Sequence, residues 1–156
     1  MRTRARLVPV LSSTFGVLLI AACGAEPEPP ALAPKPSVPA TPGEAAVWTL
    51  PEGTSLSASS TAFTALVSRL GCNSGVTGEV LAPGIRVGET EIVVTFTVAP
   101  KPPGAAACPS NDQVRFEVGL PEPLRGRQLV DGQCLAGAEA AATSFCHPGP
   151  VRYKPQ

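Results

Sequence analysis

The stretch EIVVTFTV, residues 91–98, decides the fold of this 156-residue chain. Its apolar side chains recur at every second position, and those of one face are Ile92, Val94, Phe96 and Val98. A period of two, built largely from β-branched residues, predicts a β-strand. The length of the run, eight residues without Gly or Pro, suits a central strand rather than a short edge strand.

A second stretch, QVRFEVGL at residues 113–120, alternates more sharply, with Arg115 and Glu117 between apolar neighbours. Such a strand has one face in the core and one in solvent, as antiparallel sheets commonly do. Weaker strand patterns occupy residues 78–87 and 127–130, and Pro/Gly turn signals separate the runs. Together these patterns predict an all-β domain, a small antiparallel β-sandwich or meander with Pro/Gly-rich loops.

Residues 60–70 fit two structures. A helix would gather four apolar side chains on one face: Phe63, Leu66, Val67 and Leu70. A strand would instead align Phe63, Ala65 and Val67 on one face, and the flanking Ser/Thr content suits a strand. Local propensity leaves both structures open.

The N-terminus has the pattern of an export signal. Residues 1–6 carry three arginines and no acid, and residues 7–20 are uncharged. Such a basic start followed by a short apolar run is typical of a secretory signal, and the run is shorter than the ~20 residues of a membrane span. We therefore expect residues 1–22 to be a signal peptide that is removed.

The apolar run ends in Ile20-Ala21-Ala22-Cys23, which resembles the lipobox of bacterial lipoproteins. The resemblance implies that Cys23 receives a diacylglycerol and becomes the mature N-terminus. The protein would then be anchored by lipid to the cell membrane, facing the extracytoplasmic side, or to the outer membrane if the source has two membranes. An ordinary secretory signal cleaved after Ala22, releasing a soluble protein, is the alternative.

A Pro-rich segment follows the cysteine. Seven of the 20 residues from 24 to 43 are Pro and none is aromatic, so this stretch lacks the apolar content to fold alone. We expect residues 23–43 to form a lipid-anchored, disordered spacer and residues 44–156 to form one β domain.

Four cysteines lie in that domain: Cys72, Cys108, Cys134 and Cys146. Export favours disulfides, and four cysteines allow three pairings. We favour Cys72–Cys108, which flank the central strand, and Cys134–Cys146, which bracket a short Gly/Ala-rich loop. The chain has no CxxC motif and a single histidine, His147, so we expect no metal site and no cofactor.

The sequence contains no pattern typical of catalysis. It has no GxSxG, HExxH, phosphate loop or dinucleotide fingerprint, and we expect His147 to be an exposed loop residue. Trp48 is expected to pack the first strand onto the core. Without residues 1–22 the chain has 9 basic and 12 acidic residues, a net charge of −3, and no basic cluster for nucleic acid.

We therefore expect a non-catalytic binding or structural module at the cell envelope, with an envelope protein as a candidate partner. One alternative is a glycan or lipid hydrolase using carboxylates from a candidate set: Glu79, Glu89, Glu91 and Asp112. Another is a small-ligand carrier, which needs a cavity of at least ~300 Å³, a size not expected in so small a core.

Six short motifs follow one another along the domain, at residues 66–72, 93–98, 108–111, 114–120, 122–127 and 129–132. In this combination residues 60–153 resemble a group of small exported actinobacterial proteins that lack an assigned function. Arg125 is an insertion relative to the fifth motif. The resemblance implies a strand at residues 61–70 and supports the Cys72–Cys108 pairing, and it implies no activity.

Overall fold

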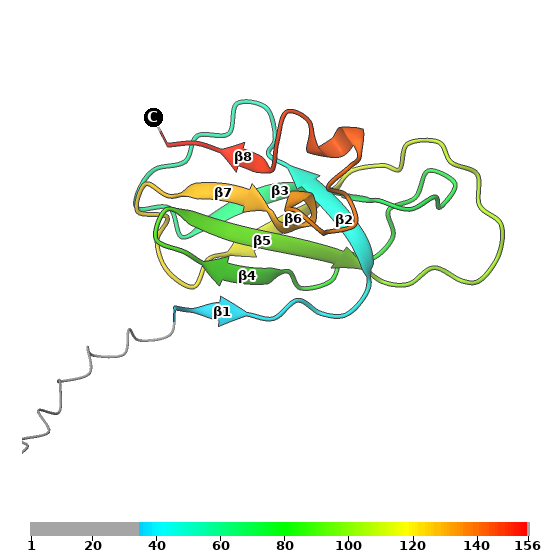
Figure 1. The fold of residues 1–156 in the computed structure, drawn as a ribbon, viewed down its shortest axis with the longest axis horizontal. Coiled ribbons are helices and arrows are strands. Elements are labelled where there is room, and N and C mark those ends of the chain that lie inside the picture. Colours follow the sequence, from blue (N-terminus) through cyan, green and yellow to red (C-terminus); the bar gives the residue numbers. More distant parts are fainter. Residues whose placement is uncertain (1–34, 156) are drawn as a thin grey trace, which may run out of the picture. The chain divides into compact units, whose positions relative to one another are not determined.

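The computed structural model describes residues 35–155 (Figure 1). The predicted signal peptide, Cys23 and residues 24–34 of the predicted spacer lie outside the described residues. The domain has eight strands and two short 3-10 turns: β1 Ser37–Val38, β2 Glu44–Thr49, β3 Ala62–Arg69, β4 Gly84–Val87, β5 Glu91–Val98, β6 Val114–Gly119, β7 Gln128–Asp131, η1 Gly132–Cys134, η2 Ser144–Cys146 and β8 Val151–Tyr153. The all-β prediction is confirmed. No helix within residues 35–155 has the length and apolarity to cross a membrane.

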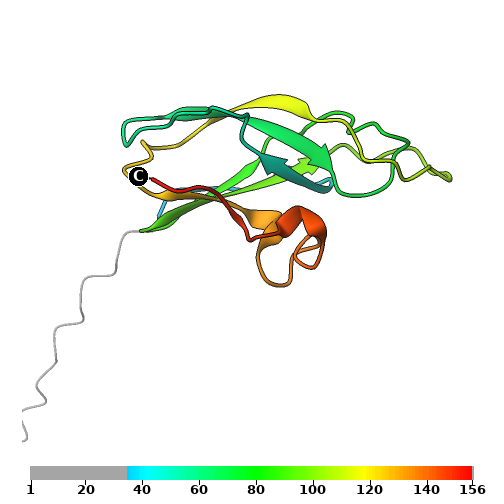
Figure 2. The same ribbon diagram turned by 90° about the horizontal axis from the view of Figure 1, so that it is seen from above.

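The strands form one curled sheet that folds into two layers (Figure 2). One layer contains β1, β4, β5, β7 and β8, and the other contains β2, β3 and β6. Strand β5 joins the layers, because its first half pairs with β7 and its last three residues pair with β2. Every strand pair is antiparallel except β5 with β7, which is parallel.

The core lies between the two layers. Ile92, Val94, Phe96 and Val98 of β5 are all fully buried there, as the alternation in their sequence predicts. Trp48 is 1% exposed and its ring centroid lies 5.3 Å from that of Phe63 and 6.4 Å from that of Phe96. The prediction that Trp48 packs the first long strand onto the core is therefore confirmed.

The ambiguous segment 60–70 is a strand. Residues Ala62–Arg69 form β3, which pairs with β2 on one side and with β6 on the other. Phe63, Ala65 and Val67 point into the core, as a strand requires. The helical alternative is wrong, because the backbone N–H and C=O groups of this segment bond to the two neighbouring strands and not to one another.

The predicted boundary between spacer and domain at residue 43 needs correction. Ser37 and Val38 form β1 and pair with β4, Val87 N–H donates to Pro36 O (3.1 Å), and Thr41 N–H donates to Ala82 O (3.2 Å). Proline prevents a segment from folding alone, but it is tolerated at the edge of a sheet. Residues 35–43 therefore belong to the β domain.

Candidate functional site

Both disulfides have the predicted pairing. Cys72–Cys108 joins the chain just after β3 to the loop before β6, with a Cα–Cα distance of 4.6 Å. Cys134–Cys146 joins η1 to η2, with a Cα–Cα distance of 5.3 Å. Each disulfide thus holds a loop that lies beside β3 or β2.

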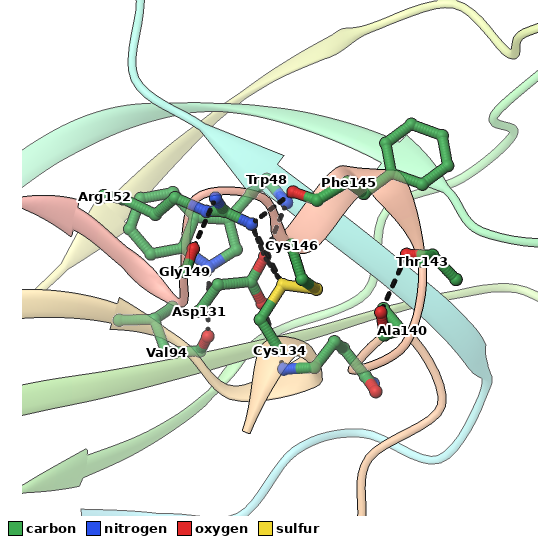
Figure 3. Close-up of a disulfide and its surroundings, with 11 residues drawn as sticks. Trp48, Val94, Asp131, Cys134, Ala140, Thr143, Phe145, Cys146, Gly149 and Arg152 are labelled. Carbon is green, nitrogen blue, oxygen red and sulfur yellow. Dashed lines mark hydrogen bonds and ion pairs between the residues drawn. A yellow bond between two sulfur atoms is a disulfide. The ribbon is translucent and has the colours of Figure 1, made fainter. Parts of the chain in front are cut away.

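A buried carboxylate, Asp131, links the second disulfide loop to β2 (Figure 3). Its Oδ2 accepts hydrogen bonds from Trp48 N and from Arg152 Nη2, both at 3.1 Å, and its Oδ1 accepts one from Gln133 N at 3.0 Å. Strand β2 pairs with β5 only as far as Ala46. The Trp48 N–H therefore has no strand partner on that edge, and the carboxylate takes its place.

Arg152 of β8 ties the C-terminal loops to this carboxylate. Its side chain is 8% exposed, and Nη2 also donates to Phe145 O at 3.1 Å and lies 3.0 Å from Cys134 Sγ. Nη1 donates to Gly149 O at 3.3 Å. The guanidinium charge is thus balanced by Asp131, and the same group positions the backbone of η2.

Burial raises the pKa of Asp131 above its ordinary value of 3.8. Removing the carboxylate from water penalises its charged form, and the hydrogen bonds from Trp48 N–H and Gln133 N–H together with the Arg152 charge oppose this effect only in part.

A cavity of about 280 Å³ lies beside this cluster, and we name it the Phe145 recess. Leu66 and Ser68 of β3, which alternate with core residues, contribute to its floor. Asn111 and Gln113 also line it, from the segment that follows Cys108. Phe145 and Arg152 line it as well, and the Phe145 side chain stands clear of the buried cluster (Figure 3).

Two buried polar atoms of the recess residues lack a hydrogen-bond partner. Among the side chains of residues 35–155, Asn111 Oδ1 and Arg152 Nε are the buried polar atoms without one. Asn111 Nδ2 donates to Arg69 O at 2.9 Å and to Gly71 O at 2.8 Å, which determines the orientation of the amide. Both atoms are buried, so neither faces the recess, although their residues line it.

Sequence reasoning missed this site. The sequence places Asn111 in the short motif at residues 108–111, and no pattern singled out Phe145 or Arg152. One signal was available, because Phe145 is a large aromatic residue next to Cys146 in the short loop that the disulfide closes. An aromatic residue held there, far from any predicted strand, is a candidate for a surface contact.

The predicted carboxylates do not meet in the recess. Glu79, Glu89 and Asp112 are exposed and Glu91 is half-buried. Glu89 shares another cavity, of about 280 Å³, with Glu122, but each is in an ion pair, Glu89 with Lys35 at 3.2 Å and Glu122 with Arg127. His147 is exposed, as predicted. Within the described part of the chain no three His, Cys, Asp or Glu side chains cluster as metal ligands would.

A surface cavity of the described residues exceeds the ~300 Å³ that a small-ligand carrier needs. A cavity of about 500 Å³ lies between the loop at residues 53–58 and the chain end at Tyr153 and Lys154. It is lined by surface loops, so the small size of the core did not limit it. Tyr153 Oη donates to Leu56 O at 2.9 Å, which places its hydroxyl in a bond within the protein.

Comparison of the chain with protein-family models, with curated proteins and with solved structures found no match.

Proposed function

We propose that the protein is a lipid-anchored, non-catalytic binding module of the cell envelope, which takes its ligand in the Phe145 recess. The observation that carries this proposal is that the Phe145 side chain, which is 45% exposed, lines a cavity of about 280 Å³ together with uncharged polar and apolar side chains. An aromatic side chain with a few polar groups beside it is a common lining of ligand cavities.

The lining of the recess supports binding rather than hydrolysis. Its only ionisable side chain is Arg152, and this side chain is already paired with Asp131. General acid–base chemistry needs a group that exchanges a proton within reach of the substrate. A recess walled by amide, hydroxyl and apolar side chains has no such group, but it can hold a ligand by shape and hydrogen bonds.

The anchor part of the proposal rests on the sequence around Cys23. The Ile-Ala-Ala-Cys ending, the uncharged run before it and the Pro-rich residues after it suit a lipidated N-terminus followed by a tether. Residues 24–34, if extended, would reach roughly 34 Å at about 3.1 Å per residue. Such a tether would let the recess face material beyond the membrane surface.

The test is retention of the unlipidated chain on isolated cell envelopes. Residues 24–156, exported behind an ordinary cleavable signal, contain all of the described residues 35–155. We expect this chain to co-sediment with envelopes of the source bacterium, and Phe145→Ala to reduce the bound fraction on the order of ten-fold. Val76→Ala is the matched control, because Val76 is 52% exposed and Phe145 45% exposed, and Val76 lies outside the recess.

Equal retention of the parent, Phe145→Ala and Val76→Ala chains would contradict a binding role for the recess. Circular dichroism of the three chains, expected to be the same, establishes that any loss of retention reflects the surface and not unfolding.

A further inference from the structure

We infer that the protein forms a two-fold symmetric dimer, in which the open edge of β6 pairs antiparallel with the β6 edge of a second copy of the chain. This dimer is a property of the domain beyond the ligand binding proposed above. Three features of β6 support it: an open row of backbone hydrogen-bonding groups, a self-complementary pair of charges and a partly exposed aromatic residue.

Strand β6 is an edge of the sheet. Among residues 35–155 it pairs with β3 on one side and with no strand on the other. The edge strands β1 and β8 have two and three residues and lie beside prolines, whereas β6 has six residues and no proline. An open edge of this kind is a template for pairing with another chain.

The backbone of β6 presents every second residue to the open edge. Leu120 N–H donates to Thr61 O at 2.8 Å, which makes Leu120 a residue bonded toward β3. In an antiparallel ladder such residues alternate with residues whose N–H and C=O groups point the other way. Counting back along β6, the backbone groups of Arg115 and Glu117 therefore point to the open edge, where both residues are exposed.

The two charges of β6 are self-complementary. Antiparallel pairing with Phe116 on the two-fold axis places Arg115 of each copy opposite Glu117 of the other. Opposite charges directly across an antiparallel pair are favourable, and like charges are unfavourable. A register centred on Arg115 or on Glu117 would place like charges opposite each other, and so would parallel pairing in register. The charge pattern therefore selects one orientation and one register.

Both charged side chains are available on the outer face of the sheet. Among residues 35–155 Arg115 belongs to no ion pair. Glu117 Oε1 accepts a hydrogen bond from Thr64 Oγ1 of β3, which orients the carboxylate and leaves Oε2 for a second donor. In the dimer, the guanidinium of Arg115 from the second copy supplies that donor.

On the inner face, Phe116 lies at the axis of this pairing. Its ring centroid is 5.4 Å from that of the buried Phe96, yet Phe116 itself is only partly buried, because β6 is an edge strand. The two Phe116 residues of the dimer would form a non-hydrogen-bonded pair, the kind in which side chains lie closest. Pairing would thus cover the apolar edge of the core that a single copy leaves in solvent.

The dimer would join the outer sheet faces of two copies. Leu66 of β3 lies directly opposite Arg115, and Leu66 and Gln113 both line the Phe145 recess. Antiparallel pairing continues a sheet without turning it over, so the two recesses would open on the same side. A six-residue strand is a small interface, so we expect association that depends on protein concentration, which the proposed lipid anchor would raise at the membrane.

The test measures the mass of the mature full-length protein, purified from the producing cells in mild detergent, by size-exclusion chromatography with light scattering. We expect a monomer at low and a dimer at high concentration. Arg115→Glu and Glu117→Arg should each weaken self-association at least about ten-fold, because every cross-strand pair then has like charges. A mixture of the two variants should form a mixed dimer as strong as the parent dimer, because every pair again has opposite charges.

Arg86→Glu is the matched control, because Arg86 is an exposed residue of β4 and the change in charge is the same as in Arg115→Glu. It should leave self-association unchanged, and circular dichroism should be the same for all the variants. Amide hydrogen exchange gives a second measurement. Exchange at Arg115 and Glu117 should slow as protein concentration rises, whereas exchange at Phe116, which already bonds to β3, should change little.

Three results would overturn the inference. The first is a parent protein that stays monomeric up to about 1 mM, the order of effective concentration that a tether provides. The second is self-association that neither charge reversal weakens, which would place the interface elsewhere. The third is a mixture of the two variants that stays monomeric.

Discussion

Asp131 is the residue on which the junction of the two layers depends. It is fully buried, and it accepts hydrogen bonds from Trp48 N–H, from Gln133 N–H and from Arg152. Two of these donors are backbone N–H groups that bond to the carboxylate and not to a neighbouring strand. Removing one member of such a buried, hydrogen-bonded ion pair commonly costs about 3–5 kcal/mol, because the remaining groups stay buried without partners.

The raised pKa of Asp131 predicts how its contribution depends on pH. The unfolded chain releases this proton near the ordinary pKa of 3.8, before the folded chain does. The contribution of Asp131 to the free energy of unfolding is therefore fully present below 3.8 and is lost as pH rises through the raised pKa of the folded state. Asp131→Asn, which does not titrate, should lack this decline.

The measurement is urea unfolding of the parent and Asp131→Asn proteins between pH 4 and 7. We expect a lower overall stability for the variant, because its NH₂ group cannot accept a hydrogen bond, and a parent-minus-variant difference that shrinks as pH rises. A difference that grows with pH would show that the folded pKa lies below the ordinary value. Trp48 fluorescence will report whether the variant keeps the parent core.

Strand β5 is the central strand of the sheet, and three other strands pair with different parts of it. The first half of β5 has β7 beside it, and the last three residues have β2 in that position. On its other edge lies β4, which β1 covers in turn. The two residues of β1 leave little of the β4 edge open to a second chain, and the prolines beside them, Pro36 and Pro39, give no N–H for further pairing.

Gly84 sets how closely the 35–43 segment can approach β4. A Cβ atom at this position would lie 2.7 Å from Ala40 N and 2.9 Å from Ala40 Cβ. We expect Gly84→Ala to push the segment away and to destabilise the protein by about 1–3 kcal/mol. Amide hydrogen exchange should quicken at Val87 N–H, which donates to Pro36 O, and at Thr41 N–H, which donates to Ala82 O.

Gly71→Ala is the matched control for this change, since a Cβ at Gly71 meets no atom within 4 Å. Unchanged exchange at Val87 and Thr41 in the Gly84→Ala protein would mean that the segment does not pack against β4 as described.

At the scale of the whole molecule, the two disulfides hold the loops from which the recess is built. Chain-entropy arguments give roughly 3.8 kcal/mol for Cys72–Cys108 and roughly 2.9 kcal/mol for Cys134–Cys146 as upper-range contributions. The two crosslinks also hold the segments that carry Asn111 and Phe145, one from each loop. Export to an oxidising compartment, as the N-terminal sequence predicts, would thus be a condition for the recess to form.

The lipid anchor is a property of the whole chain, and Cys23→Ala tests it. We expect cells fed a clickable fatty acid to label the parent protein and not the variant, because the thiol is the site of diacylglycerol attachment in the lipobox scheme. The parent should also partition into detergent with the membranes. Equal labelling of both proteins would show that Cys23 carries no lipid and would favour the ordinary secretory signal.

Strands β5 and β6 and the direction in which their side chains point were predictable from the sequence, because alternation and apolarity act between neighbouring residues. The burial of Trp48 was predictable from its large apolar ring. The sequence also favoured the observed disulfide pairing among three, because Cys134 and Cys146 bracket a short loop and Cys72 and Cys108 flank the central strand. Residues 35–43 were misassigned because proline content describes an isolated segment and not one that finds a sheet edge.

The recess depends on the tertiary structure. Its residues come from β2, β3, the loop before β6, η2 and β8, and no local pattern relates positions so far apart. Which polar atoms remain unpaired depends on how the disulfide-held loops close over the sheet. The burial of Asp131 likewise has no local signal in the sequence, because its partners Trp48 and Arg152 come from opposite ends of the domain.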